Sequence, residues 1–172
     1  MKPSLFERRT AAFTTIPLLM ACAGLGLGDV IRAPIFEVAD GRTAELRLLG
    51  PSADQPLGGA ALRLWARVQN PNPLGITLTA LDGTLYMEGT RAAAVDLPLG
   101  LPLPAAGDTV VPLDIRLGFA DLPDLADLAR RWFAGSTLDY RLDGTVTVDA
   151  GALGQPTFGP ETLLRGDVAV RR

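Results

Sequence analysis

Several residue types that support common enzyme chemistry are scarce in this chain of 172 residues. It contains no His, one Cys at Cys22, one Lys at Lys2, and serine only at Ser4, Ser52 and Ser136. The missing His excludes His-dependent nucleophile triads, and with a single Cys it also excludes the usual zinc sites. One Cys cannot form an internal disulfide, so stability must come from packing. We therefore expect no enzyme, with no catalytic residue, no cofactor and no metal.

The N-terminal residues have the pattern of an export signal. Lys2, Arg8 and Arg9 form a basic region, and residues 11–21 form an apolar region. That apolar region is too short, and too interrupted by threonine, for a lasting transmembrane helix. The sequence predicts a signal peptide over residues 1–21.

The end of this signal resembles a bacterial lipobox, Leu19-Met20-Ala21-Cys22. In such a sequence the Cys becomes the mature N-terminus and carries acyl chains. We therefore expect lipidation at Cys22 and anchoring to a membrane of the cell envelope after export. Two alternatives stay open: ordinary cleavage near Ala23 that releases a soluble exported protein, or an amphipathic N-terminal helix retained in the cytoplasm.

The charge balance limits the class of partner. Removal of residues 1–21 leaves 13 basic and 18 acidic residues, a net charge of −5. Binding to nucleic acid requires clustered Lys and Arg that neutralise phosphates. The mature chain has no Lys, so we expect no nucleic-acid partner and no electrostatic binding to membranes.

Short apolar stretches separated by turn-forming residues dominate the rest of the chain. This punctuation is typical of an antiparallel all-β domain rather than of alternating strands and helices. The sequence predicts a Gly-rich tether at residues 22–33 and one β-domain over residues 34–172. The expected extended segments are residues 35–38, 43–49, 61–69, 76–88, 91–97, 109–117, 138–149 and 163–170.

One of these segments ends in a turn of restricted chemistry. Apolar and polar residues alternate from residue 62 to 69, as in a half-buried strand, and the pattern stops at Asn70-Pro71-Asn72-Pro73. Each proline forces the preceding residue away from the α region and removes a backbone donor. We expect an extended corner in which the Asn side chains bond to main-chain groups.

Trp65 falls on the outward face of the same strand. One interpretation is that another segment covers its ring. The other is that Trp65 is an exposed contact for a client protein or a membrane.

Two further patterns refine the expected fold. Residues 122–134 have apolar residues at helical spacing, with Asp121 at the N-cap position and Gly135 as a C-terminal stop, which predicts one α-helix. Asp82-Gly83 and Asp143-Gly144 have the composition of hairpin turns, but the alternation continues through them. We expect both glycines inside strands, at a bulge or a close approach of two backbones.

The order of these features resembles the water-stress and hypersensitive-response (WHy) domain of the type 2 late embryogenesis abundant (LEA-2) proteins. The resemblance covers roughly residues 34–170 and rests on residues 68–72, 81–86, 109–113 and 140–146, with the helix before the last of these. It implies a seven-stranded antiparallel β-sandwich of the immunoglobulin or fibronectin-III type with one α-helix. It also implies a structural family signature at Asn70, Pro71 and Asn72, and no catalytic residues.

The same resemblance implies a non-enzymatic protein that protects other proteins during desiccation, cold and oxidative stress. The mean hydropathy is positive, unlike that of disordered stress proteins, so protection would come from a folded, acidic, hydrated body. We expect weak, non-specific binding of partially unfolded clients at the cell envelope. The alternative is an envelope binding or assembly lipoprotein that holds one specific protein partner.

Some acidic residues permit other interpretations. Two groups could supply oxygen ligands to a cation, namely Asp121, Asp124 and Asp127, and Asp139, Asp143 and Asp149. We expect the first group to cap a helix and the second to lie on a solvated strand face. Residues 165–167 match an integrin-binding tripeptide, but they lie within an expected strand.

Overall fold

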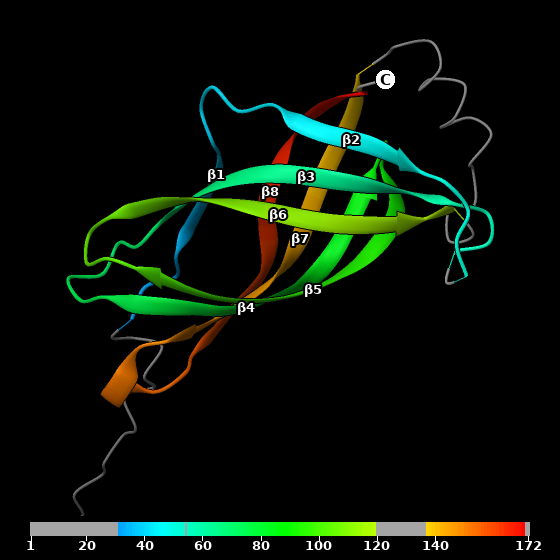
Figure 1. Cartoon of the computed structure of the whole chain (residues 1–172). Coiled ribbons are helices and arrows are strands. Elements are labelled where there is room, and N and C mark those ends of the chain that lie inside the picture. Colours follow the sequence, from blue (N-terminus) through cyan, green and yellow to red (C-terminus); the bar gives the residue numbers. More distant parts are fainter. Residues whose placement is uncertain (1–30, 54, 120–136, 171–172) are drawn as a thin grey trace, which may run out of the picture.

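The computed structural model describes residues 31–53, 55–119 and 137–170. Within these ranges the chain forms eight strands and one short 3-10 helix, η3 (Gly151–Leu153) (Figure 1). The strands are β1 (Ile35–Val38), β2 (Ala44–Leu49), β3 (Gly59–Gln69), β4 (Ile76–Met87), β5 (Thr90–Leu103), β6 (Asp108–Gly118), β7 (Leu138–Asp149) and β8 (Thr157–Val170). The described part of the protein is therefore nearly all β.

The eight strands belong to one hydrogen-bonded sheet with the order β1-β3-β2-β8-β7-β4-β5, and β6 also pairs with β3. β3 carries β6 along its whole length, while its other edge is shared between β1 and β2. A short parallel pairing between β2 and β8 connects this part to the antiparallel strands β8, β7, β4 and β5. In Figure 1, β3 and β6 cross in front of β7 and β8.

The alternation of the strands places one apolar core between these two parts of the sheet. β3 and β7 alternate buried and less buried side chains almost without exception, as the sequence pattern predicts. A single cluster unites buried residues from both, including Leu62, Leu64, Leu142 and Val146, each 0% exposed. The polar side chains of these strands consequently lie on the outer faces, where they can contact solvent or partners.

The eight extended segments expected from the sequence correspond to the eight strands, and two of these strands are longer than expected by six residues or more. β5 continues through Pro98 and Pro102 because, among the described strands, it pairs with β4 alone, so its other edge needs no backbone donors. β8 begins at Thr157, upstream of Pro160, and its pairing with β7 shifts register in this region. Proline marked these residues as turns in the sequence, whereas strand edges and bulges accommodate it.

The two Asp-Gly steps lie inside strands and bring two backbones close together. Gly83 of β4 is directly opposite Gly144 of β7. A Cβ atom at Gly83 would lie 2.3 Å from the backbone oxygen of Asp143, and one at Gly144 would lie 2.4 Å from that of Asp82. The prediction of a close backbone approach is confirmed, because only glycine fits at either position.

The structure also modifies the fold implied by the resemblance. Eight strands are present in the described residues, rather than seven, because β1 and β2 pair with different parts of the same edge of β3. The expected α-helix at residues 122–134 lies outside the described residues.

Candidate functional site

Asn70 and Asn72 are the buried polar residues of the described chain, with exposures of 0% and 1%. They follow β3 at the corner predicted from the Asn-Pro-Asn-Pro sequence. A buried amide is costly unless its donors and acceptor are satisfied. The partners of these two side chains therefore define what the corner does.

Asn70 binds the connection between β5 and β6 as well as its own loop. Its Nδ2 donates to the carbonyl oxygens of Leu74 at 2.8 Å and Pro104 at 3.0 Å. Its Oδ1 accepts from the backbone nitrogen of Asn72 at 3.0 Å and from Asn72 Nδ2 at 2.9 Å. Main-chain bonds reinforce the contact, since Asn70 N donates to Gly107 O and Ala106 N donates to Asn72 O, each at 2.8 Å.

Asn72 holds the segment that leads into β1. Its Oδ1 accepts from the backbone nitrogen of Arg32 at 2.7 Å, and its Nδ2 donates to the carbonyl oxygen of Arg32 at 2.9 Å. The Asn72 side chain therefore bonds to both backbone groups of Arg32, as a neighbouring strand would, although the two residues are 40 positions apart in the sequence. We call the two side chains and their partners the asparagine junction. Both amide donors of each Asn are used within the protein, so the junction serves architecture and leaves no donor for a ligand.

Pro71 lies between the two asparagines and is partly buried. Its fixed φ angle and missing N–H keep the corner extended. The structure thus places Asn70, Pro71 and Asn72 together at one connection of three chain segments.

Trp65 is half-buried on the outer face of β3. The guanidinium of Arg42 lies over its ring, 4.4 Å from the ring centroid, and Pro112 of β6 is its cross-strand neighbour. A cation above an aromatic face is attracted by the ring quadrupole. The ring is therefore partly covered by an arginine from the connection between β1 and β2, and neither fully enclosed nor fully free.

Ion pairs border Trp65 on the same face. Arg63 Nε and Nη2 contact the two carboxylate oxygens of Asp114 at 2.6 and 3.0 Å, and the bond from Arg63 holds the pKa of Asp114 below its usual value. Arg67 reaches Asp40 at 3.0 Å and Asp108 at 3.5 Å. All these side chains are at least partly exposed, so they contribute more to the surface charge pattern than to stability.

The outer face formed by β4, β7 and β8 has a related pattern of short polar and charged residues. Arg141 lies over the ring of Tyr86 at 4.6 Å from the centroid and forms an ion pair with Asp143 at 2.9 Å. Thr162 donates to Asp143 at 2.7 Å. Asp143 is therefore engaged by neighbours on its own face, as expected for a solvated strand face.

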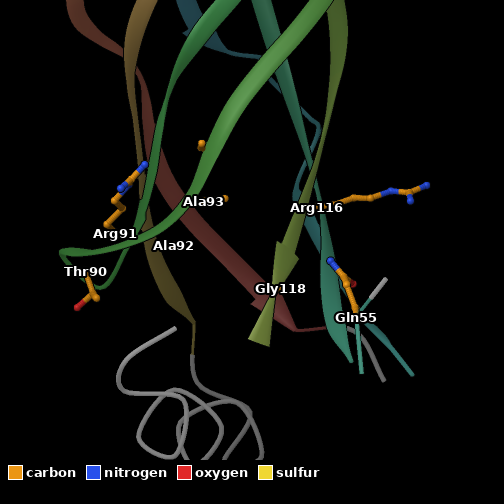
Figure 2. A pocket seen from close by; sticks show the side chains of 8 residues that line it. Gln55, Thr90, Arg91, Ala92, Ala93, Arg116 and Gly118 are labelled. Carbon is orange, nitrogen blue, oxygen red and sulfur yellow. The ribbon is translucent and has the colours of Figure 1, made fainter. Parts of the chain in front are cut away.

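A pocket of about 670 Å³ lies between the ends of β5 and β6 (Figure 2). Its charged lining residues are Arg91 and Arg116, whose side chains extend in different directions, and Gln55 and Thr90 add polar groups. Among the described lining residues, no carboxylate or thiol lies beside these arginines, and the lining supplies no base for the Thr90 hydroxyl. Across the described residues, no group of three or more acidic or Cys side chains is placed to hold a metal ion.

Cys22, the predicted lipidation residue, lies outside the described residues, as do Asp121, Asp124 and Asp127. No helix among the described residues is long and apolar enough to cross a membrane.

The sequence interpretation missed the partners of the outward arginines. A signal was available in the outward positions of the two strands, because β3 carries Arg63 and Arg67 there and β6 carries Asp108 and Asp114. The position of Arg42 above Trp65 had no such signal, because it depends on how the loop between β1 and β2 returns to β3.

The sequence model of the LEA_2 family, described as "Late embryogenesis abundant protein", matches residues 66–161, which include Asn70 and Asn72 and make up more than half of the chain. Among curated proteins no sequence matches.

Two solved structures have similar folds. A solution structure from Arabidopsis thaliana is 20% identical, with a TM-score of 0.58 over 83% of this chain and 85% of that chain. A solution structure described as that of a late embryogenesis abundant (LEA) protein is 22% identical, with a TM-score of 0.51 over 81% of this chain and 72% of that chain. At this identity the two structures support the fold alone. On the strength of the sequence match, the chain belongs to the LEA_2 family of late embryogenesis abundant proteins.

Proposed function

We propose that this protein is a WHy-type LEA-2 protein that protects other proteins against denaturation and aggregation during stress. The observation that carries the proposal is the family match over residues 66–161, since membership suggests a stress-related, non-enzymatic role. In this proposal the described strands form an immunoglobulin-like or fibronectin-III-like sandwich.

The surface chemistry suggests how such protection would work. The outer faces pair arginines with carboxylates, as in Arg63 with Asp114 and Arg141 with Asp143, while the mature chain keeps an acidic excess. A charged, hydrated body resists association with itself, and it can separate partially unfolded clients through weak contacts. The protein would thus act by occupying space between clients rather than by binding one ligand tightly.

We place this activity at the cell envelope. The support is the lipobox-like sequence that ends at Cys22, the only Cys of the chain. Acyl chains on Cys22 would hold the domain at a membrane surface after export. Mass spectrometry of the mature N-terminus tests this step, and a free Cys22 thiol or an N-terminus at Gly24 would contradict it.

Protection of a labile enzyme is the direct test of function. Residual activity after drying or freeze-thaw is measured with this protein and with an equal mass of albumin. The proposal predicts more residual activity than albumin gives, and equal activity would reject it. The fold-disrupting variant Gly83→Ala is the matched control, because its added Cβ would lie 2.3 Å from a backbone oxygen while composition and charge stay the same.

One observation favours a second candidate, an envelope module that holds a specific protein partner. Trp65, Pro112 and the 41%-exposed Val110 form an apolar strip on the outer face of β3 and β6, bordered by the ion pairs of Arg63 and Arg67. An apolar centre with a charged rim is the usual anatomy of a protein interface. One stoichiometric partner that is captured by the wild type and lost with Trp65→Ala would favour this candidate.

A further inference from the structure

We propose that the end of the domain containing the asparagine junction faces the lipid bilayer, and that it forms the contact surface between the anchored domain and the membrane. This inference rests on the proposed lipid anchor at Cys22. We define the junction end as residues 31–34, 70–75, 104–107 and 150–156, which are the lead into β1 and three connections between strands.

These four segments lie together at one end of the sheet. Asn72 joins the lead segment at Arg32 to the β3–β4 connection, and Ala106 N donates to Asn72 O from the β5–β6 connection. A shallow hollow lined by Gly75, Pro104 and Gly151, among others, adjoins the β7–β8 connection to the same end. In Figure 1 the β3–β4 and β5–β6 connections lie at the left of the molecule, with η3 below them.

The junction end lacks negative charge, although the protein as a whole is acidic. Its segments consist mainly of Pro, Ala, Gly and Leu, and Arg32 is their one charged residue. Exposed positions such as Ala105, Ala106 and Ala152 carry small apolar side chains. An acidic surface is repelled by anionic lipids, whereas an uncharged surface with one arginine is not. This end therefore suits close contact with a bilayer.

Among the residues that the structure describes, two acidic residues border the junction end, and both have partners. Asp108, at the start of β6, forms an ion pair with Arg67 at 3.5 Å. Asp149, at the end of β7, accepts from the backbone nitrogen of Gly151 at 2.8 Å and from Gln155 at 3.3 Å. Asp108 is thus paired with an arginine, whereas Asp149 has neutral donors and keeps its charge at the edge of this surface.

The length of the chain before the domain gives the orientation. Nine Cα–Cα steps separate Cys22 from Ile31, which is buried at 1% exposure, so an extended chain spans at most about 32 Å between them. The asparagine junction fixes the next residue, Arg32, to this end of the domain. The 12 residues of β4 extend about 40 Å toward the opposite end. Acyl chains in the bilayer would therefore hold the junction end nearest to the membrane.

Site-directed probes on the full lipidated chain test this orientation. The thiol of Cys22 is consumed by lipidation, so a new cysteine can carry the only thiol-linked fluorophore. We compare Ala105→Cys at the junction end with Ala94→Cys on β5, since both alanines are exposed. The protein is reconstituted into phosphatidylethanolamine–phosphatidylglycerol vesicles that contain nitroxide-labelled lipid. The orientation predicts several-fold stronger quenching of the probe at Ala105, and equal or stronger quenching at Ala94 would overturn it.

A charge substitution gives an independent measurement. In a lipidated chain that carries the fluorophore at Ala152→Cys, Ala105→Asp should weaken quenching by the same vesicles, and added salt should restore it, while Ala94→Asp should change little. Equal effects of both substitutions would also reject the orientation. Mass spectrometry distinguishes failure of the lipid anchor from failure of the orientation. If the acyl group is absent, both anchoring and orientation are wrong. If the chain is acylated and quenching is equal at the two positions, the orientation alone is wrong. Protection of a labile enzyme is measured separately and is affected by neither result.

Discussion

Replacement of Asn70 by Ala tests whether the junction stabilises the fold. The substitution removes the Nδ2 group that donates to Leu74 O, Pro104 O and, at 3.4 Å, the buried Leu103 O, and it removes the acceptor for Asn72 N and Nδ2. Each lost hydrogen bond costs roughly 0.5–1.5 kcal/mol, and a buried polar group left without a partner costs about 1–3 kcal/mol. The carbonyls of Leu74 and Pro104 are only partly buried, so water can compensate for part of their loss. We expect Asn70→Ala to lower the free energy of unfolding by about 2–5 kcal/mol.

Asn72→Ala should cost less, about 1–3 kcal/mol, because the bonds it removes to Arg32 are partly open to water. The two asparagines share a hydrogen bond, so their effects are coupled. The double variant should therefore lose less stability than the sum of the single variants, by roughly 1 kcal/mol.

Urea unfolding followed by circular dichroism measures these differences as shifts of the midpoint at constant slope. Gln69→Ala is the matched control, since this exposed neighbour makes no side-chain bond of the junction and should change stability by less than about 0.5 kcal/mol. If Asn70→Ala lowered the free energy of unfolding no more than Gln69→Ala does, the junction would not stabilise the fold. A larger loss for Asn72→Ala than for Asn70→Ala would contradict the assignment of partners.

Two further predictions concern the sheet and its surface. Gly83→Ala places a Cβ atom 2.3 Å from the backbone oxygen of Asp143, so we expect a loss of about 3 kcal/mol or more, or failure to fold. Gly50→Ala, where no atom lies within 4 Å of the added Cβ, should be nearly neutral in the same unfolding assay, and equal losses would exclude a steric cause. The hydrogen bond from Arg63 lowers the pKa of Asp114 in the folded state. The ionised Asp114 therefore stabilises the fold above the unfolded pKa of about 3.9, and this contribution is lost as pH falls through the folded pKa. The stability difference between wild type and Asp114→Asn should accordingly shrink between pH 5 and pH 2, as measured by urea midpoints, and a difference independent of pH would be inconsistent with this pair.

The sequence was sufficient to predict features that depend on local pattern. The alternation before Asn70 predicted the buried face of β3, and alternation through Gly83 and Gly144 distinguished strand interiors from hairpin tips. Both inferences succeed because side-chain period and glycine geometry are properties of a few consecutive residues.

Features that depend on contacts between distant segments could not be predicted from the sequence in the same detail. The sequence indicated that Asn70 and Asn72 would bond to main-chain groups, but it could not identify Arg32 or Pro104 as partners, because these pairings follow from the sheet order. The position of Arg42 above Trp65 likewise depends on a loop that returns to β3. The prolines made the predicted β5 too short, since the effect of a proline depends on whether its strand lies at an edge.

In the proposed function, a folded, acidic, non-catalytic body protects other proteins during stress. The most direct measurement is the residual activity of a labile enzyme after freeze-thaw with equal masses of wild type, Gly83→Ala and albumin. The proposed function predicts the highest residual activity with wild type, and a loss of this advantage with Gly83→Ala, whose composition is almost identical. Equal activity with wild type and albumin, or full protection by an unfolded Gly83→Ala chain, would contradict it.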